Sequence, residues 1–199
     1  MMKRFYLSVS FSPSPLLKQL KNVKLINQEL LINENREKDL ILYLTPVFEA
    51  PRSEMKQIKE TVSEASEDHF FDNMNFSFVH LVNLSIKPVQ ADYLLSLKAT
   101  LSDDLNYFNE DSMNCLKGYK IVKNSYQHSL FLGRFPFSPI LREKINIIKD
   151  LIESFNSLEV KSINFHEQKF EKNYEVTTIL EMNKNPQQFS HQDHRFKVI

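Results

Sequence analysis

Six segments of the chain have the apolar pattern of β-strands. In several of them bulky apolar residues alternate with small polar ones, which is the period of two that a half-buried strand shows, and proline-containing turns follow. The expected strands are residues 5–11, 39–44, 76–86, 126–135, 158–165 and 174–182. A polar stretch separates the last two, which are therefore expected to form a terminal hairpin.

Four other segments repeat their apolar residues at helical spacing. Ser14 and Ser138 each precede a proline, a combination typical of a helix N-cap and first turn. The expected helices begin at Pro15, cover residues 54–65 and 91–108, and begin again at Pro139. Residues 110–124 are expected to form a turn-rich excursion. This order predicts a single domain of the α+β or α/β class over residues 1–182, followed by a polar tail at 183–199.

The composition excludes several classes of protein. The chain has only two glycines, so no glycine-rich nucleotide loop or nucleophile elbow can be written. The single cysteine, Cys115, has no partner for an internal disulfide, which suits a reducing compartment. The apolar patch at residues 5–11 is too short to span a membrane. We therefore expect a cytoplasmic protein without a membrane partner, and most simply a monomer.

Three segments, in this order, carry a family resemblance: FYLSVS near the start, DLILYLTPV, and YQHSLFLGRF. Together with the closing helix and hairpin they resemble the two-histidine (2H) phosphoesterases of the 2'-5' RNA ligase-like group, over residues 3–182. The resemblance implies a bilobal α+β fold, in which two antiparallel sheets face a central cleft and the helices lie outside. It also implies that each of two related strands carries a His-x-Thr/Ser motif facing that cleft.

Those motifs have a clear chemical purpose. To break a 2',3'-cyclic phosphate or a 2'-5' linkage, one imidazole takes a proton from the attacking oxygen while a second donates one to the leaving oxygen. Hydroxyls two residues further along each strand share its face and hold phosphate oxygens. Neither a metal nor another cofactor is required. The implied partner is RNA or a small nucleotide phosphodiester.

The first motif departs from this pattern. Asp39 stands where the resemblance implies a histidine, and Ile41 where it implies a hydroxyl. An ionised Asp39 repels a phosphodiester, so it assists catalysis only if it is protonated or bridged by a cation. We expect this half of the site to be inactive.

The second motif has two possible registers. In the first, His128 takes the imidazole position and Leu130 replaces the hydroxyl. In the second, Gln127 replaces the imidazole, Ser129 keeps the hydroxyl, and His128 packs inward with Leu130. We prefer the first. In either register at most one catalytic histidine remains.

The other histidines are weaker candidates. His80 lies on an expected strand, where a satisfied core position is the simpler interpretation. His166 lies near the hairpin turn and is expected to be solvated. His191 and His194 lie in the polar tail, and we expect no metal site there.

Phosphate and base recognition has its own candidates. Lysines precede the His128 strand, an arginine ends it, and aromatic residues accompany both motifs, which is the combination that single-stranded nucleic-acid grooves use. The candidate substrate-binding residues are Ser129, Lys120, Arg134, Tyr43 and Tyr126, with Lys117, Lys123 and Phe135 nearby. The simpler alternative is that these lysines keep a loop soluble.

Three functional hypotheses follow. The leading one is a divergent 2H phosphoesterase-like protein that binds an RNA or nucleotide phosphodiester, with catalysis lost or reduced. The second is an active, metal-independent phosphodiesterase that uses His128 with Asp39 or His80 as its partner. The third is a protein-interaction module that keeps only the scaffold.

Overall fold

The computed structural model describes residues 1–25, 40–70, 78–89, 92–123, 128–170 and 173–182. Its strands are all antiparallel to their neighbours and form one sheet, in the order β6-β3-β1-β2-β7-β5-β4-β8-β9. The strands are β1 Met2–Phe11, β2 Leu42–Tyr43, β3 Val47–Pro51, β4 Phe78–Val89, β5 Asp92–Leu101, β6 Lys120–Lys123, β7 Ser129–Pro136, β8 Ser157–Phe170 and β9 Asn173–Glu181.

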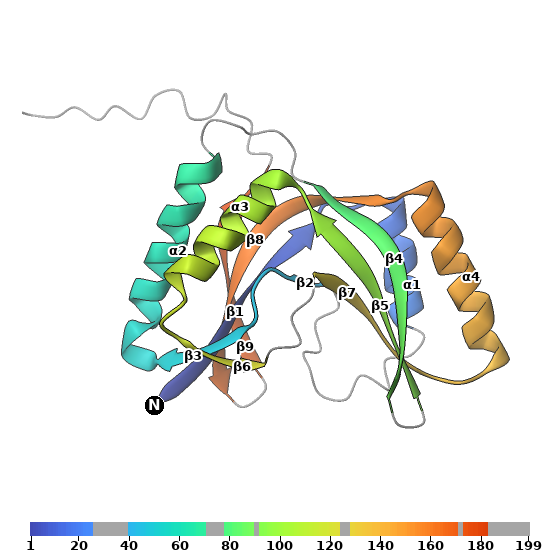
Figure 1. The fold of residues 1–199 in the computed structure, drawn as a ribbon, viewed down its shortest axis with the longest axis horizontal. Helices are drawn as coiled ribbons and strands as arrows, with labels where there is room; N and C mark the ends of the chain where they lie inside the picture. Colours follow the sequence, from blue (N-terminus) through green and yellow to red (C-terminus); the bar gives the residue numbers. More distant parts are fainter. Residues whose placement is uncertain (26–39, 71–77, 90–91, 124–127, 171–172, 183–199) are drawn as a thin grey trace, which may run out of the picture.

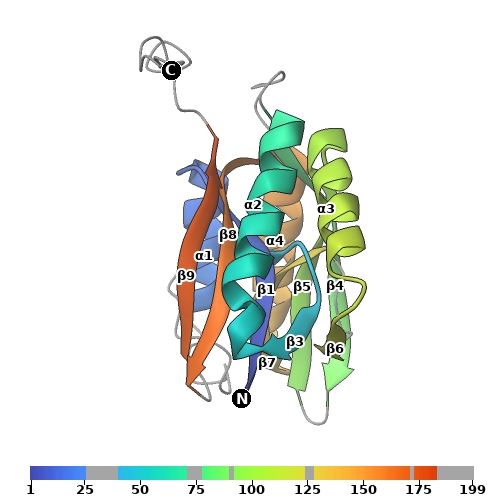
Figure 2. The ribbon, with the colours of Figure 1, turned by 90° about the vertical axis from the view of Figure 1, so that its left-hand side faces the viewer.

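Helices pack in two pairs, with strands between them (Figures 1 and 2). The helices are α1 Pro15–Leu25, α2 Met55–Phe70, α3 Asp103–Cys115 and α4 Pro139–Ser154, and a short 3-10 helix, η2 Arg52–Glu54, precedes α2. Helices α2 and α3 lie together near β1 and β3, while α1 and α4 lie near β4 and β5. The expected N-cap of α4 is present, since the Ser138 hydroxyl accepts a hydrogen bond from the Leu141 amide.

Strand β1 organises the fold because it pairs with three other strands. One edge pairs with β8 over most of its length, and the other edge pairs first with β3 and then with β2. Its side chains alternate as the sequence predicts: Phe5, Leu7 and Val9 enter the apolar core, while Tyr6 and Ser8 lie on the opposite face.

Thr45 lies between β2 and β3, the two strands that pair with the same edge of β1. The chain leaves β2 at Leu44 and begins β3 at Val47, so the backbone ladder is interrupted beside Leu7. There the Leu7 amide donates to the Thr45 hydroxyl at 3.0 Å, and that hydroxyl donates to the Pro46 carbonyl at 3.1 Å. The buried hydroxyl thus replaces a missing strand partner, which an apolar side chain cannot do.

Strand β8 connects β4 and β5 at one side of the sheet with β1 and β9 at the other. Its first residues pair with β4, its middle with β1, and its length beyond Ser162 with β9. The two facing sheets that the resemblance implies are therefore joined by hydrogen bonds in one sheet, and the separation into two lobes stays a prediction. The α+β class is confirmed.

The expected helix over residues 91–108 is wrong in its first part. Residues Asp92–Leu101 form β5, and the helix begins only at Asp103. The leucines of this segment fit both periods, but Leu95 and Leu97 are buried while Lys98 is exposed, which is the alternation of a strand. Pairing with β4 and β7 on both sides decided the outcome.

Several boundaries also differ from the expected ones. The turn-rich excursion at 110–124 is instead the end of α3 followed by strand β6, and β3 was not expected at all. Of the strand expected at 39–44, only Leu42–Tyr43 is regular. Strand β1, strand β4, helix α4 and the terminal hairpin are confirmed, with ends that shift by a few residues.

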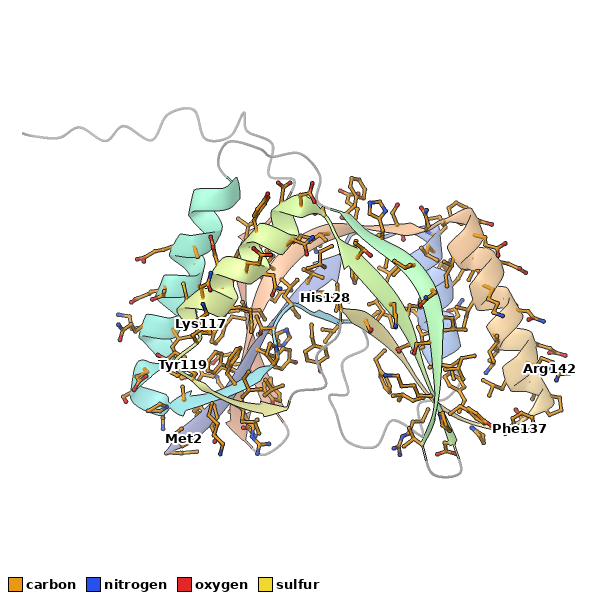
Figure 3. All side chains as sticks on the ribbon, in the orientation of Figure 1. Met2, Lys117, Tyr119, His128, Phe137 and Arg142 are labelled. Atoms are coloured by element: carbon orange, nitrogen blue, oxygen red, sulfur yellow. The ribbon has the colours of Figure 1, made fainter. Side chains whose placement is uncertain are left out.

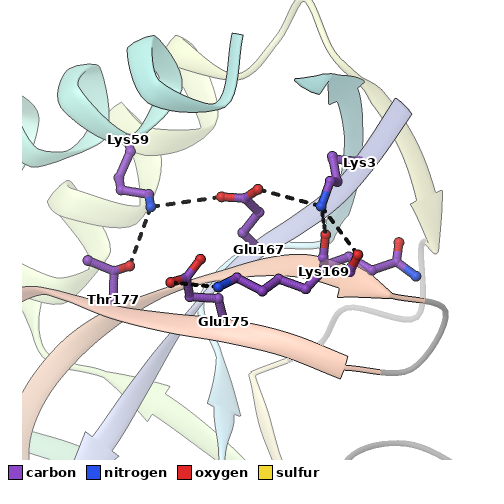
Figure 4. A network of polar contacts seen from close by, with 7 residues as sticks. Lys3, Lys59, Glu167, Lys169, Glu175 and Thr177 are labelled. Atoms are coloured by element: carbon purple, nitrogen blue, oxygen red, sulfur yellow. Dashed lines mark hydrogen bonds and ion pairs between the residues drawn. The ribbon is translucent and has the colours of Figure 1, made fainter. Parts of the chain in front are cut away.

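A polar network fixes the terminal hairpin to β1 and α2 (Figure 4). Glu167 in β8 lies 3.8 Å from the Lys3 ammonium and 3.9 Å from that of Lys59 in α2. The Lys3 ammonium also donates to the Gln168 carbonyl at 2.6 Å. Further out, Lys169 and Glu175 form a pair across the hairpin at 3.1 Å.

We predict that Glu167→Gln destabilises the protein by about 1–3 kcal/mol, because Lys3 is almost fully buried and loses its charged partner. The matched control is Glu175→Gln, which removes a half-exposed pair and is expected to cost less than about 1 kcal/mol. Urea denaturation of both variants measures the difference, and equal midpoints would contradict the role given to Glu167.

Candidate functional site

Strands β2 and β7 meet at one residue pair that sets the direction of every side chain nearby. Leu42 lies directly opposite Leu130, and both are fully buried. Because side chains alternate along each strand, the residues on either side of these leucines point to the opposite face of the sheet. That face carries Ile41 and Tyr43 from β2 and its approach, and Ser129 and Phe131 from β7, all four half-buried. We call these four residues the central face.

The central face contains no imidazole. Its members are aliphatic, aromatic and hydroxyl-bearing, so within it there is no group that exchanges a proton near neutral pH. Ser129 lies on this face, as the second register of the motif requires. Asp39, Tyr126 and Gln127 lie outside the described residues.

His128 lies just before β7, in the middle of the molecule (Figure 3). Its carbonyl accepts from the Ala99 amide at 2.8 Å, which attaches it to β5. Its half-buried ring is hydrogen-bonded to the Tyr43 backbone. Burial lowers the pKa of this imidazole, while the bond to the Tyr43 backbone opposes that shift. His128 is therefore tied to β2 through the backbone of a central-face residue.

The Tyr43 ring lies at the end of a group of aromatic rings on the same face of the sheet. Its ring lies 4.7 Å from that of Tyr6, which in turn stacks on His166 at 4.4 Å and meets Tyr174 at 5.2 Å. The expectation that His166 is solvated is wrong, because β8 extends to Phe170 and places this ring in the sheet interior, 2% exposed.

His166 also belongs to a polar strip across β1, β8 and β9. Its Nε2 shares a hydrogen bond of 2.7 Å with the Ser8 hydroxyl. Beside it the Ser10 and Ser162 hydroxyls lie 2.6 Å apart, and Asn164 accepts from Ser162. Burial lowers the pKa of His166 to about 4, so the ring is neutral in the folded protein near pH 7.

Cationic side chains lie beside the central face, on the same face of the sheet and toward β5. Lys98 in β5 pairs directly with Ser129, and Arg134 in β7 pairs with Leu94, on the same face. Arg134 was a candidate from the sequence, whereas Lys98 was missed because its segment was expected to be a helix. The alternation of Leu95, Leu97 and Lys98 was the signal that could have revealed it.

The lysines expected to join the His128 strand lie elsewhere. Lys120 is on β6, which pairs with β3 and not with β7, whereas β7 pairs with β2 further along the same edge of β1. It is exposed and forms an ion pair of 3.7 Å with Glu49. Lys117 lies beside α3, away from His128 (Figure 3). The structure thus keeps Arg134, Tyr43 and Ser129 near the central face and removes Lys117 and Lys120 from it.

His80 is also remote from the central face. It is exposed on β4, rather than in the core as expected, and β5 lies between β4 and β7. In the described part of the chain no cluster of potential ligands is suited to a metal ion. None of the described helices is long and apolar enough to cross a membrane.

This arrangement of strands and paired helices is similar to the folds of two solved 2H phosphoesterases, Usb1 and LigT. Usb1 of Kluyveromyces marxianus, solved with uridine monophosphate, superposes with a TM-score of 0.50 and 11% identity, over 88% of this chain and 97% of that chain. LigT of E. coli, solved in apo form, gives a TM-score of 0.50 and 11% identity, over 89% of this chain and 94% of that chain. No family model and no curated protein matches the sequence.

The buried His166 predicts a pH-dependent stability. Its pKa falls from 6.5 to about 4 on folding, so between these values the unfolded chain binds more protons. Stability is therefore fully present above about pH 6.5 and is lost as the pH falls toward 4, by up to about 3 kcal/mol. Urea denaturation across this range should show a flatter dependence for His166→Gln, whereas His80→Gln, at an exposed site, should follow the wild type. An unchanged slope in His166→Gln would refute the assignment.

Proposed function

We propose that this protein binds a nucleotide or an RNA phosphodiester on the central face and that catalysis is lost or much reduced. The observation that carries the proposal is the composition of the central face within a 2H fold. Aromatic rings and a hydroxyl lie there, cationic side chains lie beside it, and no imidazole belongs to it.

The loss of catalysis follows from the chemistry of the reaction. Cleavage of a phosphodiester without a metal needs one group to remove a proton and a second to supply one. Ile41, Tyr43 and Phe131 do neither near neutral pH, and the Ser129 hydroxyl is not a base. His128 is a single acid or base, so it cannot both remove one proton and supply the other.

Binding is supported by three kinds of group in one place. Tyr43 and Phe131 offer ring faces on which bases stack, and contact with the Tyr6 ring, tilted at 43°, holds Tyr43 in position. The Ser129 hydroxyl can donate to a phosphate oxygen. Lys98 lies next to Ser129 and neutralises a phosphate charge. Usb1, which has the same fold, was solved with uridine monophosphate.

A turnover assay tests the catalytic part of the proposal. The wild type, incubated with a 2',3'-cyclic nucleotide and with a 2'-5' linked oligoadenylate, is expected to release no product above a buffer control. Turnover that disappears in His128→Ala would support the alternative of an active phosphodiesterase instead, and would overturn the proposed loss of activity.

A titration tests the binding part. We expect Phe131→Ala to weaken the binding of uridine monophosphate and of a short single-stranded RNA by about 1–3 kcal/mol, the usual value of a base stacked on a ring. The matched control is Phe137→Ala, because Phe137 is 76% exposed at the far end of the molecule, beside α4 (Figure 3). Equal affinities of the two variants, measured by fluorescence anisotropy or calorimetry, would contradict the site.

A further inference from the structure

Next to the central face, the side chains of β4, β5 and β7 form regular rows across the three strands. Along β5 the leucines at 95 and 97 are buried, so Leu94, Ser96 and Lys98 share the other face. The registers of the three strands then define three rows of neighbours. The rows are Asn83, Lys98 and Ser129; Ser85, Ser96 and Phe131; and Lys87, Leu94 and Arg134.

A backbone irregularity brings Arg134 onto this face. The register of β5 and β7 shifts between Leu95 and Ser96, and Gly133 has a positive φ of 139° at that point. A side chain at Gly133 would be strained there. Because of the shift, Arg134 lies on the same face as Phe131, although the two are three residues apart.

The cationic groups fall in two separate rows. Lys98 begins one row, while Lys87 and Arg134 flank Leu94 in the other, four residues along β5. At about 3.3 Å per residue the two rows are about 13 Å apart. The row between them carries two hydroxyls and the Phe131 ring. A cation, a stacking ring with hydroxyls, and a cation pair thus follow one another along the strands.

These cations are available to a ligand. Lys87 and Lys98 are exposed and Arg134 is half-buried, and none of the three forms an ion pair with a described residue. Within the described parts of these strands, Asp92 at the start of β5 is the one carboxylate on this face. It reduces the positive potential at one end of the Arg134 row but not at Lys98.

From this spacing we propose that the ligand is a single-stranded oligonucleotide of at least three nucleotides, which places one phosphate at Lys98 and a later one at Arg134 and Lys87. The inference is based on the proposed function and specifies its ligand. A nucleoside monophosphate has one phosphate and reaches only one row. The two phosphates of a pyrophosphate are adjacent and cannot span about 13 Å. An extended strand can reach both rows with a base stacked on Phe131.

A length series tests this assignment. The probes are uridine monophosphate and single-stranded oligouridylates of two to six nucleotides, titrated into the full chain at two salt concentrations. The affinity is expected to rise by about tenfold or more between one and four nucleotides and then to level off. The salt dependence should steepen over the same range, by about 0.7 in the logarithmic slope for each added phosphate contact.

Variants identify the second row. Arg134→Gln and Lys87→Gln should lower the affinity for the hexamer toward that for the dimer, and by a larger factor than the affinity for uridine monophosphate, because only the hexamer reaches both rows. Lys98→Gln should lower the affinity for every probe, including uridine monophosphate. Arg134→Lys keeps the charge and should restore most of the hexamer affinity, which separates the role of the charge from an effect on folding. Lys149→Gln, at an exposed position of α4, is the matched control and should change nothing.

The outcomes separate the two proposals. Equal affinities for uridine monophosphate and the hexamer, or a loss in Arg134→Gln that is as large for the monophosphate as for the hexamer, would overturn the extended site and leave the proposed function standing. No binding of any probe by the wild type would refute the proposed function itself.

Discussion

The direction of the central-face side chains depends on the packing of two leucines, one from β2 and one from β7. Strand β2 contains only Leu42–Tyr43, and among the described residues its single register partner in β7 is Leu130. A slip of one residue would turn Leu42 outward and Tyr43 into the core. Exposing a buried leucine costs about 1.5–3 kcal/mol. Burying a tyrosine hydroxyl without a hydrogen-bond partner adds a further cost to the slipped register. The hydrophobic core, rather than any contact on the central face, therefore determines that Tyr43, Ser129 and Phe131 face away from it.

Buried polar groups beside the central face obey a complementary constraint. The Thr45 hydroxyl satisfies the Leu7 amide where β2 gives way to β3, and Ser8 satisfies His166 where β1 meets β8. Each of these groups is buried, and an unmade hydrogen bond would cost about 1–3 kcal/mol. The ring of Tyr6 stacks on that of His166 and also contacts the ring of Tyr43. A buried polar cluster thus supports one of the two aromatic residues of the central face.

The sequence predicts an element best where its apolar residues fit only one period, helical or strand, and a cap or a turn ends the segment. Helix α4, strand β1 and the terminal hairpin meet that condition, and all three are found. Strand β5 does not, because its leucines satisfy both periods, and the partners that make it a strand are distant in the sequence. Lys98 was missed for the same reason. The two registers of the His128 motif also could not be separated by alternation alone, since the residue opposite Leu42 comes from the pairing of strands.

Under the proposed function, the groups on this face bind without favouring cleavage. A cation such as Lys98 or Arg134 attracts a phosphodiester before and during bond breaking, and a ring that stacks on a base does not distinguish the two states. Uniform binding of this kind increases affinity but does not lower the barrier from the bound state, which needs interactions that become stronger in the transition state. Proton transfer supplies such interactions in a site without a metal, and it requires a pair of groups. Under the proposed function, a face that keeps the cations and rings but lacks the imidazole pair is therefore expected to hold a nucleic acid strand intact.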